Sequence, residues 1–440
     1  MRVALIDPSY RHEGRLMKFR RVGYFPLTLP RLAACFPPDI TPELLYEKCH
    51  DVNPATGPAY DLVLFAIMGA NLAHAIELSA GYRARGIKTV VGGFATQAFF
   101  DMCRSGFDSV VLGDGEEVIP RMIDDFRAGR LASMYENPAP SIERLPVPRY
   151  DLVPQDVVGN IIPIEASRGC PNACDFCSVT LQYQRTFRKR APDEVLRDFD
   201  AARAVFGRRV YYFTDPNFTA DLAHAKTILR GLIGKNILWL ASVDVHPLAD
   251  DEFLSLARRS GCFNLQIGFE TLSPHELEES GKGFAARTDY PALIRRAHSF
   301  GIPVTALMMV GFDSDTPATF GRMQHFAEKN HLSFVVTHPL IPIPGTPLHE
   351  KLSRQKRLKE IDPADANGLY ISFLPKHFTE SELLECYWRF STRMQSLRSI
   401  VRRFLWPGVF RNPIAYLIML LTNFAARSVI ARRLPPGAYE

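Results

Sequence analysis

Short apolar runs alternate with helical patterns along the first 130 residues. Strands are predicted by the runs at 2–7, 42–51, 60–69, 88–93 and 108–117, the last of which continues into a helix. Helices are predicted at 27–36, 71–86 and 95–106, where apolar residues recur every three or four positions. Nearly continuous apolar strands separated by helices indicate a parallel sheet that is covered on both faces.

A second strand–helix alternation follows a proline-rich stretch. Residues 131–160 contain five prolines and predict an extended connector. Residues 161–360 then carry six apolar runs, at 161–167, 209–215, 237–245, 263–270, 303–312 and 332–341. Six strands with intervening helices predict a partial (β/α)6 barrel of the TIM type, whose active site would lie at the carboxyl ends of the strands.

The final region, residues 361–440, predicts a mostly helical structure. Residues 378–405 begin with a capping pattern and favour one long helix. Residues 412–434 are the most apolar part of the chain, but their uninterrupted run of eight apolar residues is far shorter than the ~20 that span a bilayer. Two interpretations stay open: a helix packed on the body, or a membrane-surface helix flanked by Arg411, Arg427, Arg432 and Arg433.

Composition narrows the class of protein. A chain of 440 residues predicts two or three domains, and its formal charge of +5 is too small to predict nucleic-acid binding, for which clustered Lys and Arg are expected. The first ten residues resemble a strand and a loop, not a signal peptide. Five of the eight cysteines are scattered singly, which is typical of free thiols, so we expect a location in the reducing cytoplasm.

The other three cysteines, Cys170, Cys174 and Cys177, form a C-x3-C-x2-C cluster. A structural zinc site needs four ligands, and the nearest histidines lie far along the chain. A disulfide would leave one cysteine over. Three close thiolates suit a [4Fe–4S] cluster in which one iron has no protein ligand and is free to bind a substrate. Zinc and purely structural cysteines remain as alternatives.

The segment "RGCPNACDFC" resembles the cluster loop of the radical S-adenosylmethionine (SAM) superfamily, CxxxCx(aromatic)C, with Phe176 at the aromatic position. The resemblance implies that SAM chelates the open iron and is cleaved by one electron to a 5′-deoxyadenosyl radical. It implies an electron donor such as flavodoxin or ferredoxin. It also implies a set of SAM-binding residues near the strand ends, namely Phe176, Asp215, Asn217, Asp244, Glu270 and Gly311.

The first 130 residues carry three glycine-bearing turns, "IMGAN", "VGGFAT" and "LGDGEE", which are typical of a ligand site at strand ends. Joined to such a barrel, this Rossmann-like domain resembles the cobalamin-binding domain of cobalamin-dependent radical SAM enzymes. The resemblance implies cobalamin contacts from Met68, Gly69, Gly92, Gly93, Gly113, Gly115 and Glu116. Many such domains carry DxHxxG; here His12 stands only two residues before Gly14, so it is either an offset cobalt ligand or an ordinary loop histidine.

The sequence thus predicts an α/β enzyme that transfers a methyl group to an unactivated carbon of a small molecule, such as a lipid, a terpenoid or a tetrapyrrole. A cyclase or oxidase of the same type, and a non-catalytic cobalamin or redox sensor, are the alternatives. No residue is assigned a catalytic role beyond the cofactor sites. The C-terminal helix offers peripheral contact with the inner membrane.

Overall fold

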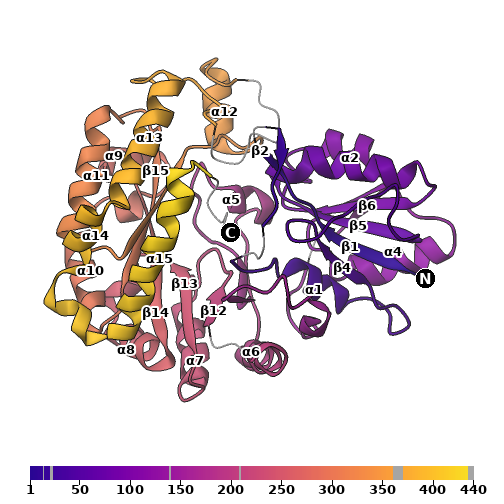
Figure 1. Ribbon diagram of the computed structural model, residues 1–440, viewed down its shortest axis with the longest axis horizontal. Helices are drawn as coiled ribbons and strands as arrows, with labels where there is room; N and C mark the ends of the chain where they lie inside the picture. Colours follow the sequence, from indigo (N-terminus) through magenta and orange to yellow (C-terminus); the bar gives the residue numbers. More distant parts are fainter. Residues whose placement is uncertain (13, 20–22, 138–139, 208–209, 360–369, 435–440) are drawn as a thin grey trace.

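The computed structural model describes residues 1–12, 14–19, 23–137, 140–207, 210–359 and 370–434. Two α/β units lie side by side, and the C-terminal helices pack on the second unit (Figure 1). The expected boundary at residues 360 and 361 lies outside the described residues.

The N-terminal unit is a parallel sheet with strand order β4-β1-β5-β6-β7-β8. Its strands are β1 (Val3–Asp7), β4 (Glu43–Tyr46), β5 (Leu62–Ile67), β6 (Lys88–Gly93), β7 (Ser109–Leu112) and β8 (Met134–Glu136). Two helices bury apolar residues against each face: α2 (Leu72–Arg83) and α3 (Phe100–Gly106) on one, α1 (Thr28–Ala33) and α4 (Val118–Arg127) on the other. The strand order reverses between β1 and β5, which is where doubly wound sheets bind ligands.

Strand β8 lies inside the stretch that the sequence predicts as a connector. It pairs with β7 through residues 134–136, so the sheet extends beyond residue 130. Only Tyr135 of the three strand residues is buried. A strand with a single buried side chain leaves no alternating pattern to detect, which explains why the sequence does not predict it.

The second unit is a six-stranded parallel sheet in chain order, which confirms the predicted partial barrel. Its strands are β9 (Ile162–Ile164), β12 (Val210–Phe213), β13 (Leu238–Val243), β14 (Cys262–Glu270), β15 (Val304–Val310) and β16 (Phe334–Pro339). Five helices follow these strands: α6 (Pro192–Phe206), α7 (Leu222–Leu232), α8 (Asp251–Ser260), α10 (Tyr290–Ser299) and α11 (Pro317–Lys329). Within the described residues β9 and β16 do not pair, so the barrel stays open on one side.

The C-terminal region is helical, but its first part differs from the prediction of one long helix over 378–405. The structure has α13 (Glu380–Met394) and a separate α14 (Leu397–Phe404). Thr379 and Glu382 form the expected capping box. The break comes at Ser396, whose side chain accepts a hydrogen bond from Ser399 N and starts α14 as its N-cap.

The last helix, α15 (Pro413–Ala431), rests on the barrel. Its Ala415 and Met419 pack against Leu240 of β13 and Phe263 of β14. Asn423 is fully buried; its amide donates to Ser333 O at 2.8 Å and accepts from the Arg403 guanidinium at 2.8 Å.

Removing the Asn423 amide should destabilise the protein, because it leaves the buried Arg403 charge with one partner fewer. We expect Asn423→Ala to lower the free energy of unfolding by about 1–3 kcal/mol in urea titrations. Ser428→Ala, on the exposed side of the same helix, is the matched control and should change it by less than about 0.5 kcal/mol. Equal effects of the two substitutions would contradict this role of Asn423.

Candidate functional site

The three-cysteine loop begins on a short antiparallel hairpin at the carboxyl end of β9. Strands β10 (Ser167–Gly169) and β11 (Phe187–Lys189) pair, and α5 (Ser178–Tyr183) lies between them in the chain. Gly169 has φ +86°, and a Cβ there would lie 2.1 Å from Thr186 O. Only glycine fits this position, immediately before the first cysteine.

The three thiols are free and close enough to affect one another's ionisation. Burial raises the pKa of Cys170, and the neighbouring Cys177 raises it further. Burial raises the pKa of Cys174 to about 12, partly opposed by Lys282. The only described trio of His, Cys, Asp or Glu ligand atoms within 4.8 Å of one another is His275, Glu276 and Glu279. The three thiols do not all lie within this distance of one another.

The segment after α9 (Pro274–Glu279) packs against the cysteine loop. Asp175 N donates to Ser280 O at 3.0 Å. Gly281 has φ +75°, and a Cβ there would lie 2.6 Å from Ala173 O. The backbone at Gly281 thus packs directly against the residue between the first two cysteines.

Lys282 and Glu270 form a buried ion pair beside Cys174. The Lys282 ammonium lies 2.7 Å from Glu270 Oε1 and also donates to Gly268 O. Burial disfavours the Lys282 charge, but Glu270 more than offsets this and the pKa of Lys282 is raised. Glu270 ends β14 with φ +58°, an uncommon conformation for a residue other than glycine and one that turns the chain at the site.

Asn217 and Asp244 also reach the loop. Burial raises the pKa of Cys170, and a hydrogen bond with the Asn217 side chain offsets a small part of this rise. Asn217 Oδ1 in turn accepts from Asp244 N at 3.2 Å. Asp244 accepts from the Asn172 amide, within the loop, at 3.3 Å. The structure therefore brings together the cysteines and three of the predicted SAM-binding residues, namely Asn217, Asp244 and Glu270.

The other predicted SAM-binding residues have partners within the protein. Asp215 is fully buried, and its carboxylate accepts from Ala166 N and from the Ser167 hydroxyl. Burial raises the pKa of Asp215 to about 7. Gly311 N donates to Asp315 at 2.8 Å, and the Phe176 ring meets Phe312 edge-on at 6.4 Å. Their contact with SAM stays a prediction.

The predicted cobalamin residues lie at the carboxyl ends of β5, β6 and β7, on one edge of the N-terminal sheet. Met68 is 58% exposed there, although it is apolar. Gly69 begins a short 3-10 helix after β5, Gly92 and Gly93 end β6, and Gly113 and Gly115 follow β7. His12 lies in a two-residue strand, β2 (Arg11–His12), paired with β3 (Arg15–Leu16). Its role as a cobalt ligand stays open.

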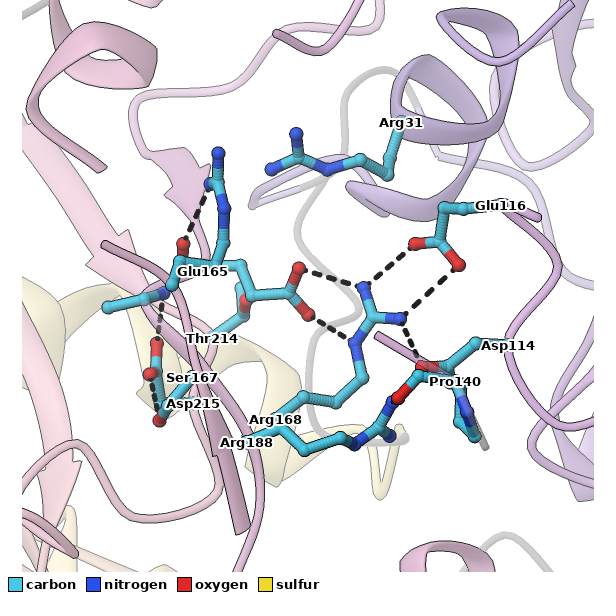
Figure 2. A network of polar contacts seen from close by, with 12 residues as sticks. Arg31, Asp114, Glu116, Pro140, Glu165, Ser167, Arg168, Arg188, Thr214 and Asp215 are labelled. Atoms are coloured by element: carbon cyan, nitrogen blue, oxygen red, sulfur yellow. Dashed lines mark hydrogen bonds and ion pairs between the residues drawn. The ribbon is translucent and has the colours of Figure 1, made fainter. Parts of the chain in front are cut away.

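Glu116 takes part in a buried ion network that joins this edge to the cysteine loop (Figure 2). Arg168, two residues before Cys170, lies 2.9 Å from Glu116, 2.9 Å from Asp114 and 2.8 Å from Glu165. Arg188, its partner across the hairpin, pairs with Asp114 as well. Burial opposes the Arg168 charge, but the three carboxylates outweigh it and the pKa of Arg168 is raised well above its ordinary value.

A second ion cluster lies next to the first. Asp198 of α6 is fully buried between Arg31 of α1, at 2.8 Å, and Arg190, at 2.5 Å. Arg190 also donates to Glu165 O at 3.2 Å. Both clusters therefore bind the N-terminal unit to the segments that flank the cysteine loop.

The concave face of the barrel carries polar groups that the sequence does not single out. Tyr212, Gln266 and His338 alternate with residues of the outer core, such as Tyr211 and Ile267, so they face the inside. Burial lowers the pKa of His338 and keeps its ring neutral near pH 7. The two-residue alternation along each strand could have identified them; Lys282, in a turn, has no such signal.

The Radical SAM superfamily profile matches residues 164–327. The chain is 27% identical over 414 residues to bacteriochlorophyllide d C-12(1)-methyltransferase of Chlorobaculum tepidum, covering 91% of this chain and 87% of that protein. It is 23% identical to bacteriochlorophyllide d C-8(2)-methyltransferase of the same organism, with 93% of each chain covered.

The fold is shared with the radical SAM methyltransferase TsrM of Kitasatospora setae, solved with tryptophan substrate and a SAM analogue. The TM-score is 0.69 at 16% identity, with 98% of both chains covered. A second structure of TsrM contains cobalamin and a [4Fe–4S] cluster and has a TM-score of 0.64, with 18% identity, 80% of this chain and 78% of that chain covered.

Substituting Gly281 should disturb the cysteine loop. Gly281→Ala adds a Cβ against Ala173 O and forces alanine into a left-handed conformation that costs about 1–2 kcal/mol. We expect it to retain much less iron and sulfide per chain after anaerobic reconstitution. Gly283→Ala, whose Cβ would meet its nearest atoms at 3.6 Å, is the control and should match the wild type. Wild-type iron content in Gly281→Ala would contradict this support of the loop.

Arg168→Gln should destabilise the whole chain, because it leaves three buried carboxylates without their shared counter-charge. We expect the free energy of unfolding to fall by about 3–5 kcal/mol. Arg149→Gln breaks an exposed ion pair with Asp151 and should cost less than about 1 kcal/mol. Denaturant titrations measure the free energy of unfolding of both variants. A loss in Arg168→Gln as small as that in Arg149→Gln would show that the ion network contributes little to stability.

Proposed function

We propose that this chain, a member of the Radical SAM superfamily through residues 164–327, is a cobalamin-dependent methyltransferase that acts on an unactivated carbon of a tetrapyrrole. The observation that carries the proposal is the placement of the three-cysteine loop. It lies at the carboxyl ends of the barrel strands and is joined through Arg168 to the strand ends of the N-terminal sheet.

The residues present suit the cofactors. Cys170, Cys174 and Cys177 would hold the [4Fe–4S] cluster, since they are free thiols on one loop and their spacing leaves one iron without a protein ligand. Asn217, Asp244 and Glu270 surround the loop with polar groups that can accept or donate hydrogen bonds to SAM. When bound, the cluster and cobalamin supply the electron that cleaves SAM and the carrier of the methyl group.

The N-terminal sheet would hold cobalamin at the end occupied by Met68, Gly92 and Gly113. An exposed methionine at a strand end offers apolar contact to a large macrocycle. Glu116, one of the predicted cobalamin contacts, pairs with Arg168, and the neighbouring Asp114 pairs with Arg168 and Arg188, so both carboxylates also help to position this end. Contact between Glu116 and cobalamin stays a prediction. The chain therefore fixes the distance between the two cofactor sites by ion pairs, not by a flexible linker.

Support for a tetrapyrrole substrate comes from two of the methyltransferases that match nearly the whole chain, both of which are named for bacteriochlorophyllide d. The concave face adds apolar Leu307 and Met309 of β15 beside the neutral ring of His338. A flat apolar ring system with polar edges suits such a lining. The methyltransferase names of full-length relatives favour an enzyme over the sensor alternative.

The experiment is anaerobic reconstitution with iron, sulfide and cobalamin, followed by incubation with SAM, a chlorophyllide and either reduced flavodoxin or dithionite. We expect 5′-deoxyadenosine and S-adenosylhomocysteine together, and a product heavier by one methylene unit. Deoxyadenosine with a change only in hydrogen or oxygen count would indicate a cyclase or oxidase and contradict methyl transfer.

Two variants separate the roles. Cys177→Ala should abolish both SAM-derived products, because the cluster loses one of its three ligands. Lys282→Met should keep the cysteines but leave Glu270 buried without its counter-charge, which costs several kcal/mol locally. We expect it to weaken SAM binding about tenfold or more at unchanged iron content, measured by equilibrium dialysis of labelled SAM. Unchanged SAM affinity would show that the Lys282–Glu270 pair does not contribute to SAM binding.

A further inference from the structure

The C-terminal helices expose an unusual amount of apolar surface. Fifteen large apolar side chains in the described residues are strongly exposed, and eight of them fall within residues 397–424. We refer to these eight as the C-terminal apolar surface: Leu397, Val401, Leu405, Phe410, Ile414, Leu417, Leu421 and Phe424. Leu405 and Phe410 are about four-fifths exposed, so the connection between α14 and α15 contributes as much as the helices do.

On α15 the exposed residues form one stripe. Ile414, Leu417, Leu421 and Phe424 follow one another at spacings of three, four and three residues, which places them on a single face. The opposite face is buried and includes Tyr416, Met419 and Asn423. The helix is therefore apolar on two sides, although among the described residues only one side has protein against it.

Length and composition alone would allow α15 to cross a membrane. The buried face argues against crossing. Asn423 is bonded to the Arg403 guanidinium and to Ser333 O, both part of the folded body. Pulling α15 away would leave these polar groups unpaired. The helix is held flat against the barrel, which is the arrangement of a helix that lies on a surface.

All the charged residues of this region are basic. Residues 386–439 contain nine arginines and no lysine, aspartate or glutamate. Arg393, Arg398 and Arg432 are exposed. The rest of the chain carries more acidic than basic residues, since all 47 acidic residues lie outside this segment while only 43 of the 52 basic residues do. The apolar surface therefore lies in a segment whose charged side chains are all arginines; of these, Arg403 is buried, and Arg402 and Arg433 pair with Glu328 and Glu385 outside the segment.

We infer that the C-terminal apolar surface docks on an anionic phospholipid membrane, with the leucines and phenylalanines in the acyl region and the arginines at the headgroups. Apolar side chains surrounded by positive charge match the two components of such a surface. A symmetric pair of copies fits less well, because a twofold interface would bring the arginine-rich segments of both chains together. The inference is independent of the proposed substrate.

The test uses the full-length protein and flotation with vesicles of phosphatidylcholine alone or mixed with phosphatidylglycerol. We expect wild-type protein to float with the anionic vesicles at least about tenfold more than with neutral ones, and less at high salt. The double variant Leu417→Ser/Leu421→Ser should lower the partition coefficient about tenfold or more. Arg393→Gln/Arg398→Gln should lower it by roughly tenfold on anionic vesicles and little on neutral ones.

Leu374→Ser is the matched control, because Leu374 is 46% exposed but lies outside the surface; it should float like the wild type. Thermal melting checks that each variant stays folded. Wild-type protein that remains soluble with both vesicles overturns the inference, as does equal binding to neutral and anionic vesicles. A dimer in light scattering that Leu417→Ser/Leu421→Ser disperses would overturn it in favour of a second copy.

Discussion

The structure depends on a buried arginine, Arg168, that three carboxylates from two units share. Taking a guanidinium and its partners out of water is expensive, so such a group is stable only when its geometry satisfies every partner. Arg168 meets this condition, because its guanidinium donates to Glu116 and to Glu165 and also pairs with Asp114. The relative position of the N-terminal unit and the β10–β11 hairpin is therefore set by this one ion network.

Apolar packing supports the same arrangement. Phe25 lies 5.7 Å from the ring of Phe206 at the end of α6, and Tyr150 of the connector contacts both rings. One continuous apolar core includes residues of both sheets. With ion pairs on one side and aromatic packing on the other, the two strand-end edges are held at a fixed separation. A reaction that needs two cofactors to meet one substrate requires such preorganisation.

The sequence alone predicted the elements that have a regular spacing of apolar residues or of cysteines. Apart from β8, the strands of both sheets leave a local signature that the fold confirms, and the cysteine loop leaves one that lies within the profile match. The partners of Asp114, Glu116 and Asp215 could not be predicted in this way. Each pairs with a residue at least 48 positions away, and nothing in the local pattern distinguishes a charge that binds a cofactor from one that joins two units.

Strand β8 determines where a stable N-terminal fragment of the protein can end. The edge of β7 is covered only because the chain returns through residues 134–136 after α4. A fragment that ends at residue 130 would leave the amide and carbonyl groups of Val110 and Leu112 open to pairing with other molecules, which is how sheet edges start aggregation. A soluble N-terminal fragment must reach at least Glu136, even though the predicted connector begins at residue 131.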